Sequence, residues 1–274
     1  MPQMRINGAG IHYAEDGKGR ETIVFAHGLL FSGRMFESQV RALRERYRCI
    51  TFDFRGQGQS EVTPSGYDMD SLTEDAAGLI EAIGCAPCHF VGLSMGGFVG
   101  MRLAIRRPGL LKSLVLLETS ADPESPDAVG RYRRLNLVAR WLGVRPVVGR
   151  VMKILFGRQF LEDPARNILK EEWRRQLLAN NRIGITRAVA GVIDRAGVYD
   201  EIGRIALPTL IIVGDQDVAT PPAKAERIRG RIPGSRLVVI PGAGHSSAIE
   251  EPGAVNQALV KFLDELGTSP RPPS

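Results

Sequence analysis

Apolar and polar positions along the chain form two kinds of pattern. Short runs that are continuously apolar predict strands buried on both faces, and longer amphipathic stretches that come after them predict helices. The predicted strands are Thr22–Ala26, Cys49–Phe54, His89–Leu93, Leu114–Leu117, Leu210–Val213 and Leu237–Ile240. The predicted helices cover residues 37–46, 70–84, 95–107, 222–230 and 251–267. This alternation predicts an α/β fold with a doubly wound parallel sheet.

One long stretch breaks the alternation. Residues 122–202 predict only helices, punctuated by proline and glycine, between two strands of the sheet. Since open α/β sheets bind ligands beyond the carboxyl ends of their strands, we expect this insertion to be a helical cap over that edge. The predicted organisation is a core of residues 1–121 and 203–267, a cap of residues 122–202, and a flexible, proline-rich tail of residues 268–274.

The composition is that of a soluble globular protein, with 274 residues of which 43% are hydrophobic and 24% charged. No apolar run approaches the roughly 18–20 residues that cross a bilayer. No apolar segment follows Met1–Arg5 as it would in a secretory signal. We therefore expect a cytoplasmic protein without a membrane span, and the sequence leaves its oligomeric state open.

The net charge of +6 is concentrated in residues 125–200, which hold 15 Lys and Arg against 7 Asp and Glu. These residues are spread among helix-like apolar positions, which favours a solvated helical face. A nucleic-acid or membrane-surface binder is the alternative for so basic a segment. Because no aromatic residues interleave the arginines as base stacking requires, we expect no nucleic-acid partner.

The chain has three cysteines, Cys49, Cys85 and Cys88. An odd number without a secretion signal argues against a disulfide framework, and no second pair completes a zinc site. We expect no metal. The Cys85-x-x-Cys88 spacing is explained by chance or, as the alternative, by a reactive thiol pair.

The strongest chemical signal is Gly92-Leu93-Ser94-Met95-Gly96, between an apolar strand and an amphipathic helix. In that context the pattern predicts a sharp strand–turn–helix that exposes the Ser94 hydroxyl at a helix N-terminus. A serine hydroxyl attacks well only when a base takes its proton. Ser94 is therefore our candidate nucleophile.

Of the four histidines, His245 has the best position for the base. It follows the last predicted strand in a glycine-rich loop, and loops held on a rigid sheet are where catalytic groups collect. His89 begins a strand, and His27 precedes the glycine of an early loop, so we interpret both as structural. His12 lies in a strand-like segment without chemical context.

The base needs an acid that fixes its tautomer. Asp217 follows the penultimate strand, with Asp215 as a brace of the same turn, and the order Ser94, Asp217, His245 is that of the α/β hydrolases. Glu118, which ends the strand after the nucleophile helix, is the alternative acid.

An oxyanion hole needs two preorganised N–H donors. Met95, directly after the nucleophile, offers one at the helix N-terminus. The loop that follows Thr22–Ala26 offers the other, and Gly28 lets this loop turn so that Leu29 N–H is the expected donor.

These motifs together resemble the α/β-hydrolase superfamily. The resemblance rests on His27-Gly28, Asp53–Ser60, Gly92–Gly97, Gly214–Asp217 and Gly244-His245, which occur in order over nearly the whole chain. It implies an eight-stranded, mostly parallel sheet with a helical cap after the sixth strand, and no cofactor.

Within that superfamily the chain is most similar to carboxylesterases and 3-oxoadipate enol-lactonase-like lactonases, through Gly-Leu-Ser-Met-Gly-Gly and the segment from Gly244 to Pro252. We expect hydrolysis of a small-molecule ester or lactone through an acyl-enzyme. The alternatives are a carbon–carbon bond hydrolase and a non-catalytic binding member of the fold. Phe31, Trp141 and Phe156 are expected to line an apolar acyl pocket.

Overall fold

Eight strands form one sheet in the computed structural model, which describes residues 3–268. The strands are β1 Gln3–Ile6, β2 Ala9–Asp16, β3 Thr22–Ala26, β4 Arg48–Phe52, β5 Cys88–Leu93, β6 Leu111–Leu117, β7 Thr209–Gly214 and β8 Arg236–Ile240. Their order is β1-β2-β4-β3-β5-β6-β7-β8. β2 pairs antiparallel with β1 and β4, and the remaining pairs are parallel. The predicted doubly wound, mostly parallel sheet is confirmed.

Each of the six strands predicted from apolar runs is present, and the two N-terminal strands carry no such run, although the strand-like segment of His12 is β2. β1 lies at the edge of the sheet and is largely exposed, while β2 is buried only over its first half. Such strands carry no continuous apolar run, because one face or one end meets water. The apolar pattern therefore identified the buried part of the sheet and missed its antiparallel edge.

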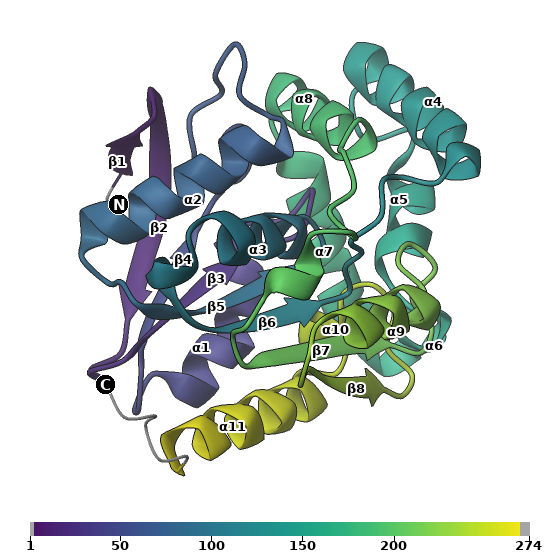
Figure 1. The fold of residues 1–274 in the computed structure, drawn as a ribbon. Coiled ribbons are helices and arrows are strands. Elements are labelled where there is room, and N and C mark those ends of the chain that lie inside the picture. The colour runs from purple at the N-terminus through teal and green to yellow at the C-terminus, as the bar shows by residue number, and fades with distance from the viewer. Residues whose placement is uncertain (1–2, 269–274) are drawn as a thin grey trace.

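Helices cover both faces of the sheet (Figure 1). Outside the insertion they are α1 Glu37–Leu43, α2 Met69–Ile83, α3 Met95–Arg106, α9 Pro222–Arg231, α10 Ser247–Glu250 and α11 Pro252–Thr268. Successive strand residues point to opposite faces. In β3, Val24 packs in one apolar cluster with α2, α3 and α9, whereas Phe25 packs in a second cluster with α1 and α11. Apart from Thr268, the predicted tail lies outside the described residues.

The secondary-structure elements of the insertion between β6 and β7 are all helices, and we call residues 122–202 the cap. It contains α4 Pro126–Leu142, α5 Val148–Leu155, α6 Arg158–Glu162, the 3-10 turn Pro164–Arg166, α7 Asn167–Ala179 and α8 Arg182–Ile193. Figure 1 shows α4, α5 and α8 above the sheet in this view, with α4 next to α8. Phe156 and Phe160 belong to the same apolar cluster as Ile240 and Ala243 of the core. The cap therefore shares a core with the sheet.

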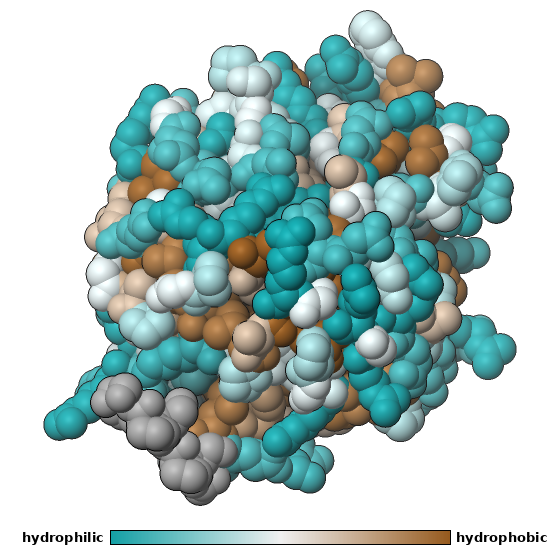
Figure 2. Space-filling model, in the orientation of Figure 1, coloured by the Kyte–Doolittle hydropathy of each residue, from teal (hydrophilic) through white to brown (hydrophobic). Residues whose placement is uncertain are grey.

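The surface in Figure 2 is mostly hydrophilic, with apolar residues among polar ones over α4. None of the helices in the described part of the chain is long and apolar enough to cross a membrane.

Candidate active site

Ser94 occupies a strained turn between β5 and α3. Its φ of 52° and ψ of −106° lie in a region that side-chain-bearing residues rarely adopt, at a cost of about 1–3 kcal/mol. Two close approaches force the turn: a Cβ on Gly92 would lie 2.3 Å from Gly96 O, and one on Gly96 would lie 2.0 Å from Ala26 O. Ser94 N–H donates to Leu117 O at 2.8 Å, which ties the turn to β6.

His245 reaches Ser94 from the loop after β8. Its Nε2 lies 2.9 Å from Ser94 Oγ, and its Nδ1 lies 2.8 Å from Asp217 Oδ2. Because a carboxylate only accepts, Nδ1 carries the proton and Nε2 is free to accept the Ser94 hydroxyl proton. All three residues are at least 92% buried, with exposed fractions of 8% for Ser94, 5% for His245 and 3% for Asp217. The structure thus brings together the three predicted residues in a continuous hydrogen-bonded chain.

Asp217 is itself held by donors of its own turn. Its Oδ1 accepts from the N–H groups of Ala219 at 2.8 Å and Thr220 at 2.9 Å, while Thr220 Oγ1 donates to Oδ2 at 2.8 Å. The Thr220 hydroxyl also lies 3.3 Å from His245 Nδ1. We did not predict Thr220, although the Asp-x-x-Thr spacing is typical of such turns. Asp215 accepts from Gly242 N–H at 2.8 Å and so links this turn to the histidine loop.

Glu118, the alternative acid, lies elsewhere. It is fully buried at the end of β6, and within the described residues no hydrogen bond or ion pair joins it to His245. Burial raises the pKa of Glu118 well above its usual range, and contact with Ser247 offsets only part of this effect. A raised pKa favours the neutral carboxyl, and only the anion stabilises an imidazolium, so this environment suits Glu118 poorly to the role of acid.

The two expected oxyanion donors, Leu29 N–H and Met95 N–H, have no acceptor within the described residues. Met95 begins α3, where the helix leaves its first N–H groups unpaired. The loop of Leu29 is fixed by Gln57, whose Oε1 accepts from Leu30 N–H at 2.8 Å. Leu30 has a φ of 74°, so this loop is held in a strained shape.

His27 braces the same loop, as interpreted from the sequence. Its Nε2 accepts from Phe54 N–H at 2.9 Å and its Nδ1 donates to Gly28 O at 2.7 Å. Burial lowers the pKa of His27, and the neutral ring is the form that can both donate and accept. His89 is likewise buried, with Nδ1 2.8 Å from Ser113 Oγ.

A cavity of about 130 Å³ opens beside Ser94 and His245. Most of its lining is aliphatic and comes from the cap. The cap residues include Leu135, Ala139, Val144, Val147, Val151, Ile154, Leu155, Ile185, Val189, Val192 and Ile193, and the core adds Leu29, Leu30, Phe31, Leu93 and Phe98. The site therefore pairs a polar reacting edge with an apolar chamber.

Of the three predicted pocket residues, only Phe31 lines this cavity. Trp141 is 70% exposed and lies outside it. Ala139 faces the cavity, and two residues further along a helix the side chain has turned by about 200°. Phe156 is buried behind Phe31, with ring centroids 6.2 Å apart, so it supports the wall without forming it. The expectations for Trp141 and Phe156 were wrong.

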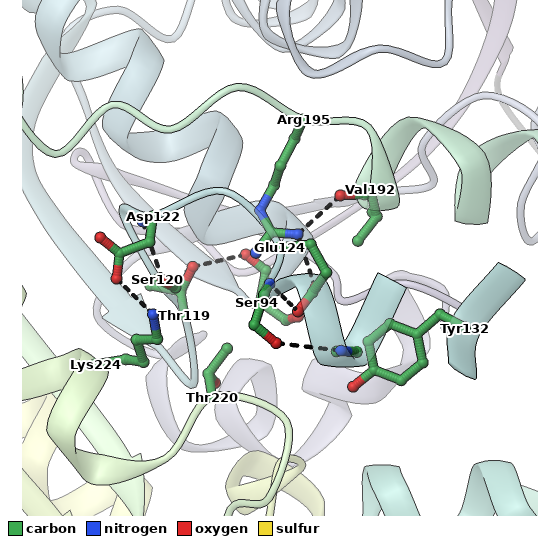
Figure 3. A network of polar contacts seen from close by, with 12 residues as sticks. Ser94, Thr119, Ser120, Asp122, Glu124, Tyr132, Val192, Arg195, Thr220 and Lys224 are labelled. Carbon is green, nitrogen blue, oxygen red and sulfur yellow. Dashed lines mark hydrogen bonds and ion pairs between the residues drawn. The ribbon is translucent and has the colours of Figure 1, made fainter. Parts of the chain in front are cut away.

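One ion pair interrupts the apolar lining (Figure 3). Arg195 Nη1 donates to Glu124 Oε2 at 3.0 Å and to Val192 O at 2.8 Å, and its guanidinium lies 4.2 Å from the centroid of Phe98. In the same view Thr119 Oγ1 donates to Ser94 O at 2.9 Å. Neither arginine nor threonine was predicted, because neither belongs to a recognisable motif.

The cysteines lie away from this chemistry. All three are free and buried, and Cys88 lies at the opposite end of β5 from Ser94. A hydrogen bond with Cys85, together with burial, raises the pKa of Cys88 well above its usual range. Among residues 3–268, no three His, Cys, Asp or Glu side chains are grouped so that they could hold a metal ion.

Comparisons with known proteins agree with the fold and the motifs. The α/β-hydrolase fold family matches residues 21–252, and the chain belongs to that family. A Mycobacterium tuberculosis protein named "Putative non-heme bromoperoxidase BpoC" is 31% identical over 92% of this chain and 96% of its own.

Two solved structures are similar over almost their full length. A thermophilic esterase from Thermogutta terrifontis has a TM-score of 0.90 and 29% identity, covering 98% of this chain and all of that one. The enol-lactonase from Burkholderia xenovorans LB400 has a TM-score of 0.89 and 29% identity, covering 96% of this chain and all of that one. The predicted resemblance to the esterase and enol-lactonase branch is confirmed.

Proposed function

We propose that the protein is a serine hydrolase that cleaves carboxylic esters or lactones. One observation carries the proposal: Ser94 Oγ, His245 Nε2, His245 Nδ1 and Asp217 Oδ2 form one chain of contacts of 2.9 and 2.8 Å beside an apolar cavity. A nucleophile, a base and an acid in this order are the requirements for acyl transfer through a covalent intermediate.

The reaction has two stages. Ser94 Oγ attacks the carbonyl carbon while His245 Nε2 takes the hydroxyl proton, and the tetrahedral intermediate expels the alcohol, to which His245 returns the proton. Water then attacks the acyl-Ser94 ester and loses a proton to His245, which returns it to Ser94 Oγ as the bond between that oxygen and the acyl carbon breaks, and the carboxylic acid leaves. In a lactone the alcohol and the acid belong to one molecule, so the product is a hydroxy acid.

The unpaired N–H groups of Leu29 and Met95 support this mechanism. In both stages the carbonyl oxygen becomes negatively charged, and preorganised donors at that point each contribute about 10²–10³ in rate. Leu30, held by Gln57, keeps the first of these donors in place.

The cavity indicates the kind of acyl group. Its volume of about 130 Å³ is close to that of protein cavities that take up a benzene-sized molecule. Each buried methylene contributes about 0.8 kcal/mol until the chamber is full. We therefore favour short, apolar acyl groups or a single lactone ring. The esterase of Thermogutta terrifontis and the enol-lactonase of Burkholderia xenovorans are consistent with both kinds of substrate.

Hydrolysis of p-nitrophenyl butyrate by the protein and by its Ser94→Ala variant tests the proposal. We expect turnover by the native protein that disappears in the variant. A well-folded native protein that hydrolyses neither esters from acetate to octanoate nor a γ-lactone would exclude the proposal. That outcome would favour a carbon–carbon bond hydrolase or a ligand-binding protein.

A further inference from the structure

A single buried carboxylate connects the loop of His245 with the cap. Glu250, at the end of α10, is 2% exposed. Its Oε2 accepts from the N–H groups of Gly244 at 3.0 Å and Gly157 at 2.8 Å, and its Oε1 accepts from Ser246 N–H at 3.0 Å. Gly244 and Ser246 flank His245, while Gly157 belongs to the cap between α5 and α6. The carboxylate therefore binds the histidine loop on both sides of the histidine and the cap at the same time.

The two segments are in direct contact at this point. A Cβ on Gly244 would lie 2.1 Å from Gly157 N, and one on Gly157 would lie 2.8 Å from Gly244 N. A second link lies next to the first, because Ser246 Oγ donates to Leu155 O at 2.7 Å. Leu155 also lines the cavity, so the histidine loop and the cavity wall are joined by adjacent hydrogen bonds.

A third link comes from the cap. Arg166 Nη1 donates to the main-chain oxygen of Glu250 at 2.5 Å, and its Nη2 donates to Glu251 Oε1 at 2.7 Å. Glu251 is next to Glu250 in the chain, but its side chain is 29% exposed and forms an ion pair with the partly buried guanidinium of Arg166. Of these two adjacent glutamates, Glu250 is the one whose side chain accepts from the backbone on both sides of His245.

Charge also distinguishes Glu250. The groups that face it are His245 and the buried carboxyl of Glu118, together with the three N–H donors. Burial raises the pKa of Glu250, and the three backbone hydrogen bonds and His245 oppose that rise. As an anion it accepts all three hydrogen bonds and favours a positive charge on the imidazole during acyl transfer.

We propose that Glu250 is a positioning residue, which seats the His245 loop against the cap and so holds the base and the cavity wall in one geometry. The inference depends on the proposed serine hydrolase mechanism, in which His245 is the base. According to this inference Glu250, which is neither nucleophile, base nor acid, contributes measurably to the rate of hydrolysis.

The matched variants are Glu250→Gln and Glu251→Gln, which remove the same charge at adjacent positions. A glutamine at 250 has one acceptor oxygen and an amide that itself donates, so at least one of the three N–H groups loses its partner. A displacement of the base by about 1 Å can cost 10²-fold in rate. We expect kcat to fall about 10- to 100-fold in Glu250→Gln, with a smaller change in KM, and to stay within about twofold in Glu251→Gln.

The pH profile separates positioning from loss of fold. Removing a negative charge near the imidazole disfavours its protonated form, so the acid limb of the kcat/KM profile should move to lower pH in Glu250→Gln and stay in place in Glu251→Gln. Glu250→Asp keeps the charge on a shorter side chain and should recover part of kcat. Equal kcat values and superimposable profiles for the native protein and a folded Glu250→Gln would overturn the inference.

Amide hydrogen exchange tests the link without any turnover. We expect the N–H groups of Gly157, Gly244 and Ser246 to exchange at least tenfold faster in Glu250→Gln than in the native protein, and at native rates in Glu251→Gln. Unchanged protection would contradict the anchoring role even if the native protein were inactive. Loss of turnover in Ser94→Ala with unchanged Glu250→Gln would reject this inference alone.

Discussion

Replacing Asp217 with Asn tests most directly whether Asp217 is the acid that orients His245. In the native structure Oδ2 accepts from His245 Nδ1 at 2.8 Å and from Thr220 Oγ1 at 2.8 Å, while Oδ1 accepts from two backbone N–H groups. An asparagine of the same shape keeps its oxygen toward the backbone donors, so its NH₂ group faces His245. The imidazole must then accept at Nδ1 and carry its proton on Nε2, where it can no longer take the proton of Ser94.

A wrong tautomer of this kind costs about 10⁴ in kcat in serine proteases, or roughly 5 kcal/mol of transition-state stabilisation. We expect a loss of that order in Asp217→Asn, with KM and the melting temperature little changed because the backbone contacts of Oδ1 remain.

The assay is steady-state hydrolysis of p-nitrophenyl butyrate, with Glu118→Gln as the matched control. Glu118 is buried, has a raised pKa and makes no hydrogen bond to His245 among the described residues, so its exchange for glutamine should leave kcat within about threefold. Full activity in Asp217→Asn together with a large loss in Glu118→Gln would refute the assignment and make Glu118 the acid.

Three further outcomes follow from the same contacts. Because its pKa is raised, the Glu118 carboxyl stays protonated in the folded protein at pH values above 4.5, at which the unfolded chain releases the proton. The free energy of unfolding therefore falls as pH rises, by up to about 1.4 kcal/mol per pH unit. In thermal unfolding from pH 5 to 9, the melting temperature of Glu118→Gln should fall less steeply with pH than that of the native protein. Equal slopes for the two proteins would contradict this. Thr220→Val removes a hydroxyl from Asp217 Oδ2, and we expect kcat to fall about tenfold, measured with the butyrate ester. Trp141→Ser should leave KM for that ester within about twofold, whereas Ala139→Phe, which fills the cavity, should raise KM for butyrate far more than for acetate; equal effects on both esters would contradict the assigned wall.

The meeting of Ser94, His245 and Asp217 could be predicted because the position of each depends on local sequence. Ser94 needs a strand, two glycines and a helix within a few residues, and His245 and Asp217 each follow an apolar strand directly. In a parallel sheet such positions meet at one edge, so the order along the chain suffices to bring them together. The loop of Gly28 and Leu29 follows β3 directly, so its place at this edge could be predicted for the same reason.

The cap and the supporting residues depend on distant contacts. The prediction for Trp141 was wrong because the direction in which its side chain points depends on the rotation of α4 about the helix axis. That rotation is set by packing against α8 and by the residues that face the cavity. Glu250 acts through Gly157, which is 93 positions away in the chain. No local pattern indicates which backbone N–H groups a buried carboxylate will find, so its part in the site became visible only in the folded structure.

Covalent labelling of Ser94 tests the central claim most directly. A fluorophosphonate reacts with a serine only when a neighbouring base and an oxyanion hole activate it, and the adduct is stable enough for peptide mass spectrometry. The account predicts one equivalent of label on the peptide that contains Ser94, with esterase activity lost in proportion, and labelling abolished in Ser94→Ala. Label on a different residue, or hydrolysis that persists when Ser94 is fully modified, would contradict it.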